Sequence, residues 1–450
     1  MDKYDIIVIG GGPAGMVTAM TVRKQHNDKS ILMIKDALKG IVPCGIPYVF
    51  HELGDINKNT MGPKPFVDMG GEVLIDQVQR VDTKERIVEV ASGKKIGFEK
   101  LVFATGSKPF VTEFIPGYDL EEGVGYVPKS YEGIVALKQQ TDNASKIVVL
   151  GSGFTAVELA EQLAQEPGKE VRLVYRAEHC LMKSFSSDIA GRVDESLDKV
   201  GVILHPRCQI TEILGKNGKA TGICLEDGQT IDADLVIVAM GYRPRGELAA
   251  EAGINVNKHN AIIVDNYLRT SADDVFAVGD CAQTQGFITG RGSQIMLAST
   301  GAAEARILGY NLYSMRIMRN FPGTLSVFST EIGGHSFASA GVIEPEARAA
   351  GIDIVVGQFQ DIDRHPGTLS GVSPIGAQLV VSAGDGRIIG GELFGGKSVG
   401  EMVNTLALAI QKNVTVYELI SFQVGTHPKL TTAPTKPILI KAAEKALEQL

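Results

Sequence analysis

The sequence predicts an α/β protein built from two Rossmann-like dinucleotide-binding units and a C-terminal αβ domain. Two glycine-rich turns predict the first two units, because each turn follows a short apolar strand and precedes an amphipathic helix. These turns begin at Gly10 and Gly151. From about residue 321 onward the pattern changes to strands separated by turns, including a hairpin predicted at Asp385-Gly386, and this pattern predicts the third unit.

The length and composition suit this organisation. The chain has 450 residues, enough for roughly three domains, and its 52 glycines are typical of nucleotide-binding α/β proteins. A formal net charge of -8 argues against a nucleic-acid-binding surface. No apolar stretch reaches the roughly 18 residues that a membrane span needs, and the start of the chain shows no signal peptide, so we expect no membrane partner.

The number and spacing of the cysteines indicate the redox environment of the protein. The five cysteines show neither metal-ligand spacing nor the density of a disulfide scaffold. We therefore expect no metal site and a reducing, cytoplasmic location.

The first glycine-rich turn is the run GGGPAG at residues 10–15, after the apolar strand at residues 6–9. Gly10 makes the turn, Gly12 lets a pyrophosphate approach the backbone, and Gly15 lets the helix pack closely on the strand. The helix N-terminus, with free N–H groups, then faces the phosphates. The residues predicted to bind this dinucleotide are Gly10, Gly12, Pro13, Ala14 and Gly15.

One expected contact of this first unit is missing. An acidic residue roughly 20 positions past the glycines should end the second strand and bind the adenosine ribose. Lys35 stands there, and Asp36 follows. Either Asp36 binds the ribose from the next position, or the ribose is held in another way.

The second glycine-rich turn, after the strand at residues 147–150, predicts that Gly151, Gly153 and Phe154 bind a second dinucleotide. The strand that follows ends in Tyr175-Arg176 without a carboxylate. Because a guanidinium pairs with a 2′-phosphate, Arg176 favours NADPH over NADH. Glu178 opposes this preference, and the alternative is that Arg176 is a solvated charge at the strand end.

Three further motifs carry a resemblance to a known family. The run Ala104-Thr105-Gly106 resembles the ATG motif that closes the first nucleotide segment of two-dinucleotide flavoproteins. The run 239–241, ending in Gly241, is similar to its counterpart in the second segment. The segment 270–282 resembles the second flavin motif, in which Asp280, after Gly279, bonds the ribityl chain of FAD.

With all motifs in the family's order over about residues 1–310, the chain is identified as a member of the pyridine nucleotide–disulfide oxidoreductases. The resemblance implies FAD and NADP or NAD as cofactors. It implies cofactor contacts at Ala104, Thr105, Gly106, Gly241, Gly279 and Asp280.

The resemblance also implies a domain layout. An FAD domain at residues 1–115 and 245–322 surrounds an NAD(P) domain at 116–244. A dimerisation domain at 323–450 follows, so a homodimer is expected.

Cys44 is the candidate catalytic residue. Lys39 stands where the first cysteine of a CxxxxC redox pair would be, so thiol chemistry here uses a single protein sulfur. The run PCGIPYV at 43–49 resembles the single-cysteine branch of the family: coenzyme A disulfide reductases, NADH oxidases and NADH peroxidases. A helix that begins at Cys44 and runs to Leu53, together with the neighbouring oxidised flavin, is expected to lower the pKa of the thiol. The alternative is a buried, inert cysteine.

These features predict an NAD(P)H oxidoreductase that reduces a small disulfide, polysulfide or persulfide through FAD and Cys44. One alternative is an NAD(P)H oxidase that reduces O₂ or peroxide and cycles Cys44 through a sulfenic acid. Another is an electron-transfer flavoprotein for which Cys44 is dispensable.

The C-terminal region adds a second candidate catalytic residue. Thr426-His427-Pro428 resembles the His-Pro of glutathione and lipoamide reductases, whose histidine is the acid–base catalyst. Those enzymes have a glutamate where Thr432 stands. His427 is therefore either a catalyst that approaches Cys44 of a partner subunit, or a structural or surface histidine.

Overall fold

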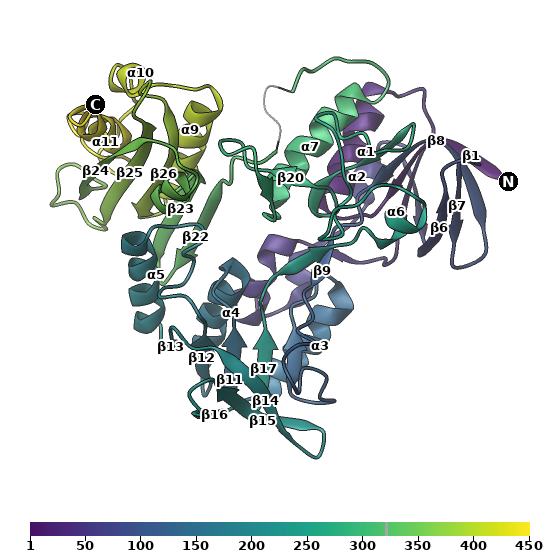
Figure 1. The fold of residues 1–450 in the computed structure, drawn as a ribbon, viewed down its shortest axis with the longest axis horizontal. Coiled ribbons are helices and arrows are strands. Elements are labelled where there is room, and N and C mark those ends of the chain that lie inside the picture. The colour runs from purple at the N-terminus through teal and green to yellow at the C-terminus, as the bar shows by residue number, and fades with distance from the viewer. Residues whose placement is uncertain (320–322) are drawn as a thin grey trace.

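The computed structural model describes residues 1–319 and 323–450 of the chain. Figure 1 shows three lobes, with the N-terminal lobe and the C-terminal lobe standing on either side of the second lobe. None of the helices in the described ranges is long and apolar enough to cross a membrane.

The first lobe contains a sheet of the order β5-β2-β1-β8-β7-β6, with β19 also paired to β8. Its strands are β1 (Asp2–Ile9), β2 (Ile31–Lys35), β5 (Glu72–Ile75), β6 (Val78–Asp82), β7 (Ile87–Val90), β8 (Lys95–Phe103) and β19 (Val275–Ala277). The helices α1 (Pro13–Gln25) and α7 (Ala298–Asn311) pack against each other beside it. Because β19 returns from late in the chain, this lobe consists of two separate segments.

The second lobe contains a parallel sheet of the order β10-β17-β11-β12-β13 and a small antiparallel sheet, β14-β15-β16. The parallel strands are β10 (Val124–Tyr126), β11 (Lys146–Leu150), β12 (Glu170–Val174), β13 (Ile203–His205) and β17 (Leu235–Val238). The antiparallel strands are β14 (Ile210–Lys216), β15 (Lys219–Leu225) and β16 (Thr230–Asp232). The helices are α3 (Tyr131–Asn143), α4 (Phe154–Ala164) and α5 (Ser187–Lys199).

The third lobe is an antiparallel sheet of the order β22-β23-β26-β25-β24, covered by helices. Its elements are β22 (Phe328–Ile332), β23 (His335–Gly341), α8 (Glu344–Ala349), β24 (Ile354–Ile362), β25 (Pro374–Ser382), β26 (Ile388–Gly395), α9 (Val399–Gln411), α10 (Val416–Ile420) and α11 (Ile438–Leu447). A hairpin predicted at Asp385-Gly386 joins β25 to β26, and Gly386 has a φ of +70°.

The remaining elements of the described residues are short. They are β3 (Gly40–Ile41), η1 (Pro43–Gly45), η2 (Pro47–Phe50), η3 (Ile56–Asn59), β4 (Thr60–Met61), α2 (Lys64–Val67), β9 (Ser107–Pro109), β18 (Tyr242–Pro244), α6 (Glu247–Glu251), η4 (Gly279–Cys281), β20 (Thr284–Gln285) and β21 (Gly292–Ser293). β9 and β18 pair antiparallel, so the two chain crossings between the first and second lobes run side by side. The domain boundaries at 115/116 and 244/245 stay predictions, and the boundary at 322 lies outside the described residues.

The prediction of a single helix from Cys44 to Leu53 is wrong. The segment forms two short 3₁₀ helices, η1 and η2. Pro43 and Pro47 each lack the N–H that a continuous helix needs, and each begins a new turn. Cys44 therefore does not stand at the N-terminus of a regular helix.

A buried carboxyl group joins the second and third lobes. The backbone N–H of Ser186, which precedes α5, donates to Oε1 of Glu392 on β26 at 2.6 Å. Glu392 is fully buried, and this burial raises its pKa to about 7. On the neighbouring turn of α5, the Arg192 guanidinium lies over the Phe394 ring at 4.2 Å. The stability of this lobe contact therefore depends on the protonation of Glu392.

Glu392→Gln tests this dependence. A pKa raised above the unfolded value gives stability that is present at low pH and lost as the pH rises through about 7. Glutamine does not ionise, so the melting temperature of the wild type should fall relative to Glu392→Gln between about pH 5 and about pH 8. Calorimetry with excess FAD measures this difference, and Glu226→Gln on an exposed turn is the matched control. Parallel pH profiles of the wild type and Glu392→Gln would contradict the assignment.

Candidate active site

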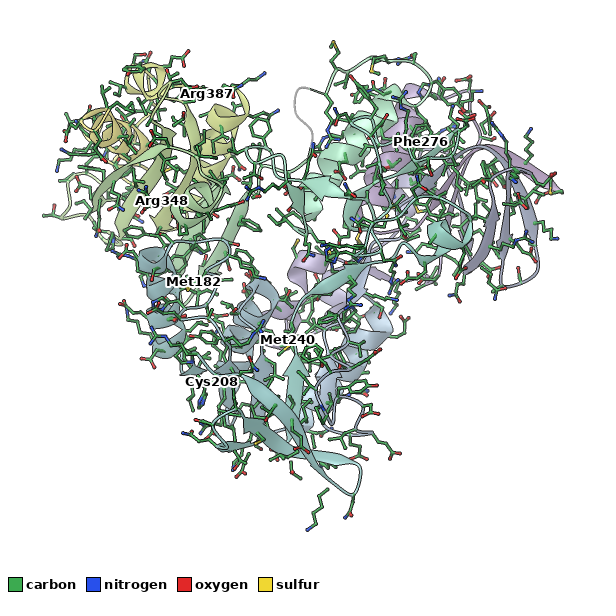
Figure 2. The ribbon with its side chains drawn as sticks, in the orientation of Figure 1. Met182, Cys208, Met240, Phe276, Arg348 and Arg387 are labelled. Carbon is green, nitrogen blue, oxygen red and sulfur yellow. The ribbon has the colours of Figure 1, made fainter. Side chains whose placement is uncertain are left out.

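A cavity of about 2030 Å³ is lined by both glycine-rich turns and by residues of all three lobes. Pockets for one small ligand commonly measure about 300–1,000 Å³, so this volume suits two dinucleotides. In the second lobe the lining includes Met182, Cys208 and Met240, which Figure 2 labels. In the third lobe it includes Phe328 of β22.

The first glycine turn is held by a close backbone contact. Gly10 has a φ of +112°, and a Cβ there would overlap the carbonyl oxygen of Ala104. A Cβ at Gly15 would overlap the carbonyl oxygen of Gly10, so Gly15 serves packing and does not line the cavity. Among the described residues, no atom other than those of the adjoining chain lies within 4 Å of the Cβ position at Gly12. The turn therefore leaves room for a phosphate in front of α1, whose N-terminus has no side-chain cap.

The other residues predicted to bind the first dinucleotide gather around this turn. Those that line the cavity are Gly10, Gly12, Pro13, Ala14, Asp36, Ala104, Thr105, Gly106, Gly279 and Asp280. Lys35 is buried beneath Gly11, and its Nζ donates to the Leu38 carbonyl at 3.3 Å. Asp36 lies at the end of β2 and lines the cavity, and its contact with the ribose stays a prediction. These residues fit FAD. The N-terminus of α1 has no side-chain cap, the backbone at Gly12 is open, and the Asp280 carboxylate lines the same cavity.

The second glycine turn repeats the same geometry. Gly151 has a φ of +134°, and a Cβ there would lie 2.5 Å from the Ala239 carbonyl oxygen. Apart from the adjoining chain, the residues that the structure describes leave the Cβ position of Gly153 open to 4 Å, and α4 begins at Phe154. Gly241 also lines the cavity.

Arg176 is exposed and lines the same cavity. Among the residues that the structure describes, no ion pair is recorded for its guanidinium. Glu178, which was expected to oppose NADPH, forms an ion pair with Arg207 instead. Arg176 is therefore free to meet an anionic group of the second dinucleotide.

Cys44 is exposed toward the cavity, and all five cysteines are free. The helix part of the predicted pKa lowering is wrong, and the effect of oxidised flavin on the thiol stays a prediction. Partial burial and the Glu158 carboxylate raise the pKa of the thiol, while the Lys129 ammonium lowers it. No regular helix begins at Cys44 to supply the expected dipole.

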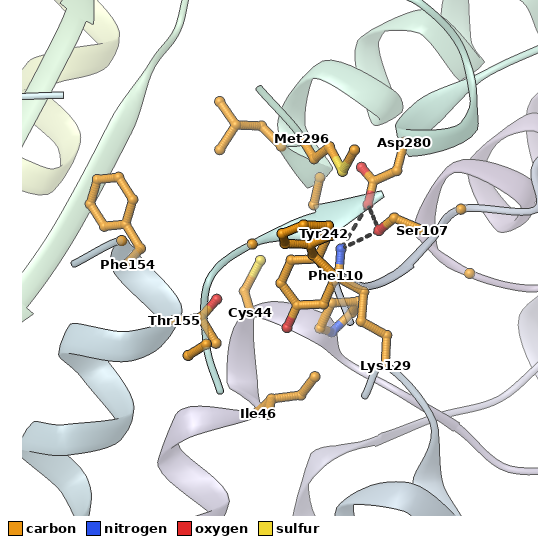
Figure 3. Close-up of a pocket in the computed structure, with 18 of the residues that line it drawn as sticks. Cys44, Ile46, Ser107, Phe110, Lys129, Phe154, Thr155, Tyr242, Asp280 and Met296 are labelled. Carbon is orange, nitrogen blue, oxygen red and sulfur yellow. Dashed lines mark hydrogen bonds and ion pairs between the residues drawn. The ribbon is translucent and has the colours of Figure 1, made fainter. Parts of the chain in front are cut away.

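Beside Cys44 lies a polar cluster that the sequence did not reveal (Figure 3). Lys129 Nζ donates to Asp280 Oδ2 at 2.7 Å and to Ser107 Oγ at 2.8 Å, and the Ser107 hydroxyl donates to Asp280 at 2.7 Å. The ammonium also lies 4.3 Å from the centre of the Tyr242 ring. Ser107 and Tyr242 directly follow the two closing motifs, which is a signal that sequence reasoning could have used.

β22 of the third lobe completes the wall near α4. The Thr330 hydroxyl donates to Glu158 at 2.8 Å, and burial raises the pKa of Glu158 to about 7. The rings of Phe154 and Phe328 stack with centres 5.1 Å apart. β22 of the third lobe thus packs against α4, the helix that follows the second glycine turn.

His427 does not line the cavity of the single chain. It lies in an exposed segment, and its Nδ1 accepts from the Lys429 backbone N–H at 3.2 Å. Its catalytic role stays a prediction. Among the described residues, no group of three or more His, Cys, Asp or Glu is arranged to hold a metal ion.

Two glycine-turn cradles that line one cavity together with the exposed Cys44 thiol define a two-dinucleotide flavoprotein oxidoreductase. The chain belongs to the pyridine nucleotide-disulphide oxidoreductase family, whose model matches residues 4–305. The model of the family's dimerisation domain matches residues 329–438. The protein is accordingly an oxidoreductase that uses FAD and a pyridine nucleotide.

Similar proteins carry two kinds of activity in their names. An NADH oxidase of Methanocaldococcus jannaschii is 30% identical over 99% of both chains. A CoA-dependent NAD(P)H sulfur oxidoreductase of Pyrococcus abyssi is 30% identical over 95% of both. The structure of an NAD-dependent persulfide reductase from A. fulgidus matches with a TM-score of 0.90 and 26% identity, over 99% of this chain and 83% of that one.

The two open glycines give a matched pair of variants. The methyl group of alanine at Gly12 or Gly153 would lie more than 4 Å from any described residue beyond the adjoining chain, so both variants should fold normally. Gly12→Ala should weaken FAD binding by about tenfold or more, because its methyl group occupies the phosphate site. Gly153→Ala should retain FAD and instead raise the KM for NAD(P)H. FAD titration of the apoprotein measures the first effect, and equal FAD affinities of the two variants would contradict the assignment.

Proposed function

We propose that the protein is an FAD-dependent NAD(P)H oxidoreductase that reduces a small disulfide, polysulfide or persulfide through Cys44. The observation that carries this proposal is the exposed Cys44 thiol in a cavity lined by both glycine turns. Lys39 occupies the place of a second redox cysteine, so the substrate must supply the other sulfur. The sulfur and persulfide reductases among the similar proteins support this acceptor class.

The residues of each cradle have distinct tasks in this proposal. Gly10, Gly12 and Asp280 hold FAD, and Gly151 and Gly153 hold the nicotinamide dinucleotide. FAD, when bound, supplies the two-electron carrier between the nicotinamide and the thiol.

Cys44 performs the sulfur chemistry. Its thiolate attacks one sulfur of the substrate, the S–S bond breaks, and the other sulfur leaves as a thiolate that takes a proton. The mixed disulfide at Cys44 is then cleaved by the two electrons that NAD(P)H provides. This cleavage returns the Cys44 thiolate and releases the second substrate thiolate, so each disulfide consumes one NAD(P)H.

Cys44→Ser tests the proposal. The variant should lose disulfide, polysulfide and persulfide reduction, because a hydroxyl does not form the mixed disulfide. Reduction of bound FAD by NAD(P)H in a stopped-flow instrument should continue at nearly the wild-type rate. Cys224→Ser is the control, since Cys224 does not line the cavity. Full disulfide reductase activity of Cys44→Ser would instead favour an electron-transfer flavoprotein.

A second candidate function is an NAD(P)H oxidase. It is favoured by the similarity to the Methanocaldococcus jannaschii NADH oxidase along almost the whole chain. The two functions differ in the acceptor. Rapid NAD(P)H consumption in air without added sulfur compound, abolished under anaerobic conditions, would establish the oxidase. Anaerobic turnover with a disulfide would establish the reductase.

We also propose that the protein is a homodimer that works in the cytoplasm. The match to the dimerisation domain supports the first statement, together with exposed apolar side chains at Phe422 and Leu430. The five free thiols support the second. In such a dimer, His427 of one subunit is proposed to approach the Cys44 site of its partner.

Arg176→Ala tests the coenzyme preference that we propose, NADPH over NADH. Because the Arg176 guanidinium is exposed to the cavity and Glu178 is paired with Arg207, Arg176 can bind the 2′-phosphate. The variant should raise the KM for NADPH by about tenfold and leave the KM for NADH nearly unchanged. Steady-state kinetics with both coenzymes measures this, and Lys199→Ala, an exposed cation at the end of α5 that does not line the cavity, is the control. Equal effects on both coenzymes would show that Arg176 does not bind the phosphate.

A further inference from the structure

We propose that Lys129 is a positioning residue that supplies the positive charge balancing the Cys44 thiolate. Asp280, Ser107 and Tyr242 hold its ammonium group for this purpose. The inference deepens the proposed function, because it concerns the thiol that the function assigns to substrate. Nothing in the sequence motifs marks Lys129, which lies in the loop between β10 and α3.

Three contacts from three different segments fix the ammonium group. Asp280 Oδ2 accepts a hydrogen bond from Lys129 Nζ at 2.7 Å, and Ser107 Oγ accepts one at 2.8 Å. The centre of the Tyr242 ring lies 4.3 Å from the same nitrogen. The Tyr242 hydroxyl in turn donates to the Val127 carbonyl at 2.9 Å, within the same loop as Lys129. Only 22% of the Lys129 side chain is exposed, so its position is not that of a free surface lysine.

The charges around Cys44 show why this cation matters. Glu158 from α4 and Asp280 from η4 both act to raise the pKa of the thiol, as does burial. Lys129 acts in the opposite direction. Burial raises the pKa of Tyr48 on η2 strongly and that of Tyr242 on β18 to about 12, so both phenols stay neutral. Without Lys129, a thiolate at Cys44 would face two carboxylates.

The ion pair also crosses between lobes. Asp280 belongs to η4, which packs on α7 of the first lobe, and Ser107 begins β9, at the crossing between the first and second lobes. Lys129 lies in the loop before α3 of the second lobe. Asp280 is the residue predicted to bind the ribityl chain of FAD. The same carboxylate would therefore hold the cofactor and the lysine that favours the thiolate, so cofactor binding and thiol reactivity depend on one cluster (Figure 3).

The test measures thiolate formation and not turnover. The holoenzyme is reduced, desalted under anaerobic conditions and treated with iodoacetamide over a range of pH, and alkylation of Cys44 is followed by mass spectrometry. Iodoacetamide is uncharged, so the variants do not change its local concentration. Lys129→Met should slow alkylation of Cys44 about tenfold at neutral pH, which corresponds to an upward shift of about one pH unit in the midpoint.

Three variants make the test specific. Lys129→Arg keeps the charge and should restore most of the alkylation rate. Glu158→Gln removes an opposing charge and should move the midpoint downward. Lys108→Met, on β9 beside Ser107 but paired with Glu247, should leave the profile unchanged. Alkylation of Cys208 in the same samples serves as the internal reference.

An unchanged midpoint in Lys129→Met would overturn the inference, as would a failure of Lys129→Arg to restore the rate. If Lys129→Met does not retain FAD, Lys129→Gln is measured, because it keeps a donor to Asp280 without the charge. A wild-type midpoint in Lys129→Gln would likewise overturn it. Cys44→Ser tests the proposed function separately. If Cys44→Ser is inactive while Lys129→Met has the wild-type alkylation profile, only this inference is refuted.

Discussion

The structure depends on one repeated constraint, the contact of a glycine with the backbone carbonyl of a distant motif. Gly10 lies against Ala104 and Gly151 lies against Ala239, each with a φ that suits glycine. A side chain at either position would separate the fingerprint turn from the strand end that closes the fold. These two contacts hold the glycine turns so that the turns and the starts of α1 and α4 line the same cavity.

The lobes are then joined by polar contacts. Lys129 meets Asp280 between the first and second lobes, Glu158 meets Thr330 near the cavity, and Ser186 meets Glu392 farther out. Unpaired buried polar groups are costly, so each pair specifies one relative placement of its lobes. The shape of the cavity is therefore maintained by groups whose charge depends on pH, and two of them, Glu158 and Glu392, have a pKa of about 7.

Local signals predicted much of the fold. The two glycine turns and the Asp385-Gly386 hairpin were visible because each is decided within a few residues. The predicted helix at Cys44 failed because Pro43 and Pro47 interrupt it, although both prolines were visible in the sequence. The partnership of Lys129 with Asp280 spans 151 positions, and no sequence pattern announces a contact of that range. For the same reason, the hydrogen bond from Thr330 to Glu158 could not be predicted from the sequence.

The environment of Cys44 combines two opposing requirements. A partly buried thiol is shielded from water, but burial disfavours the thiolate that the chemistry needs. Glu158 strengthens this opposition as the pH rises through about 7, because it then acquires its charge. Because the raised pKa of the thiol lies above that of Glu158, the Cys44 thiolate forms beside a carboxylate that is already charged. The Lys129 ammonium, which stays charged across this range, opposes that carboxylate and lowers the pKa of the thiol.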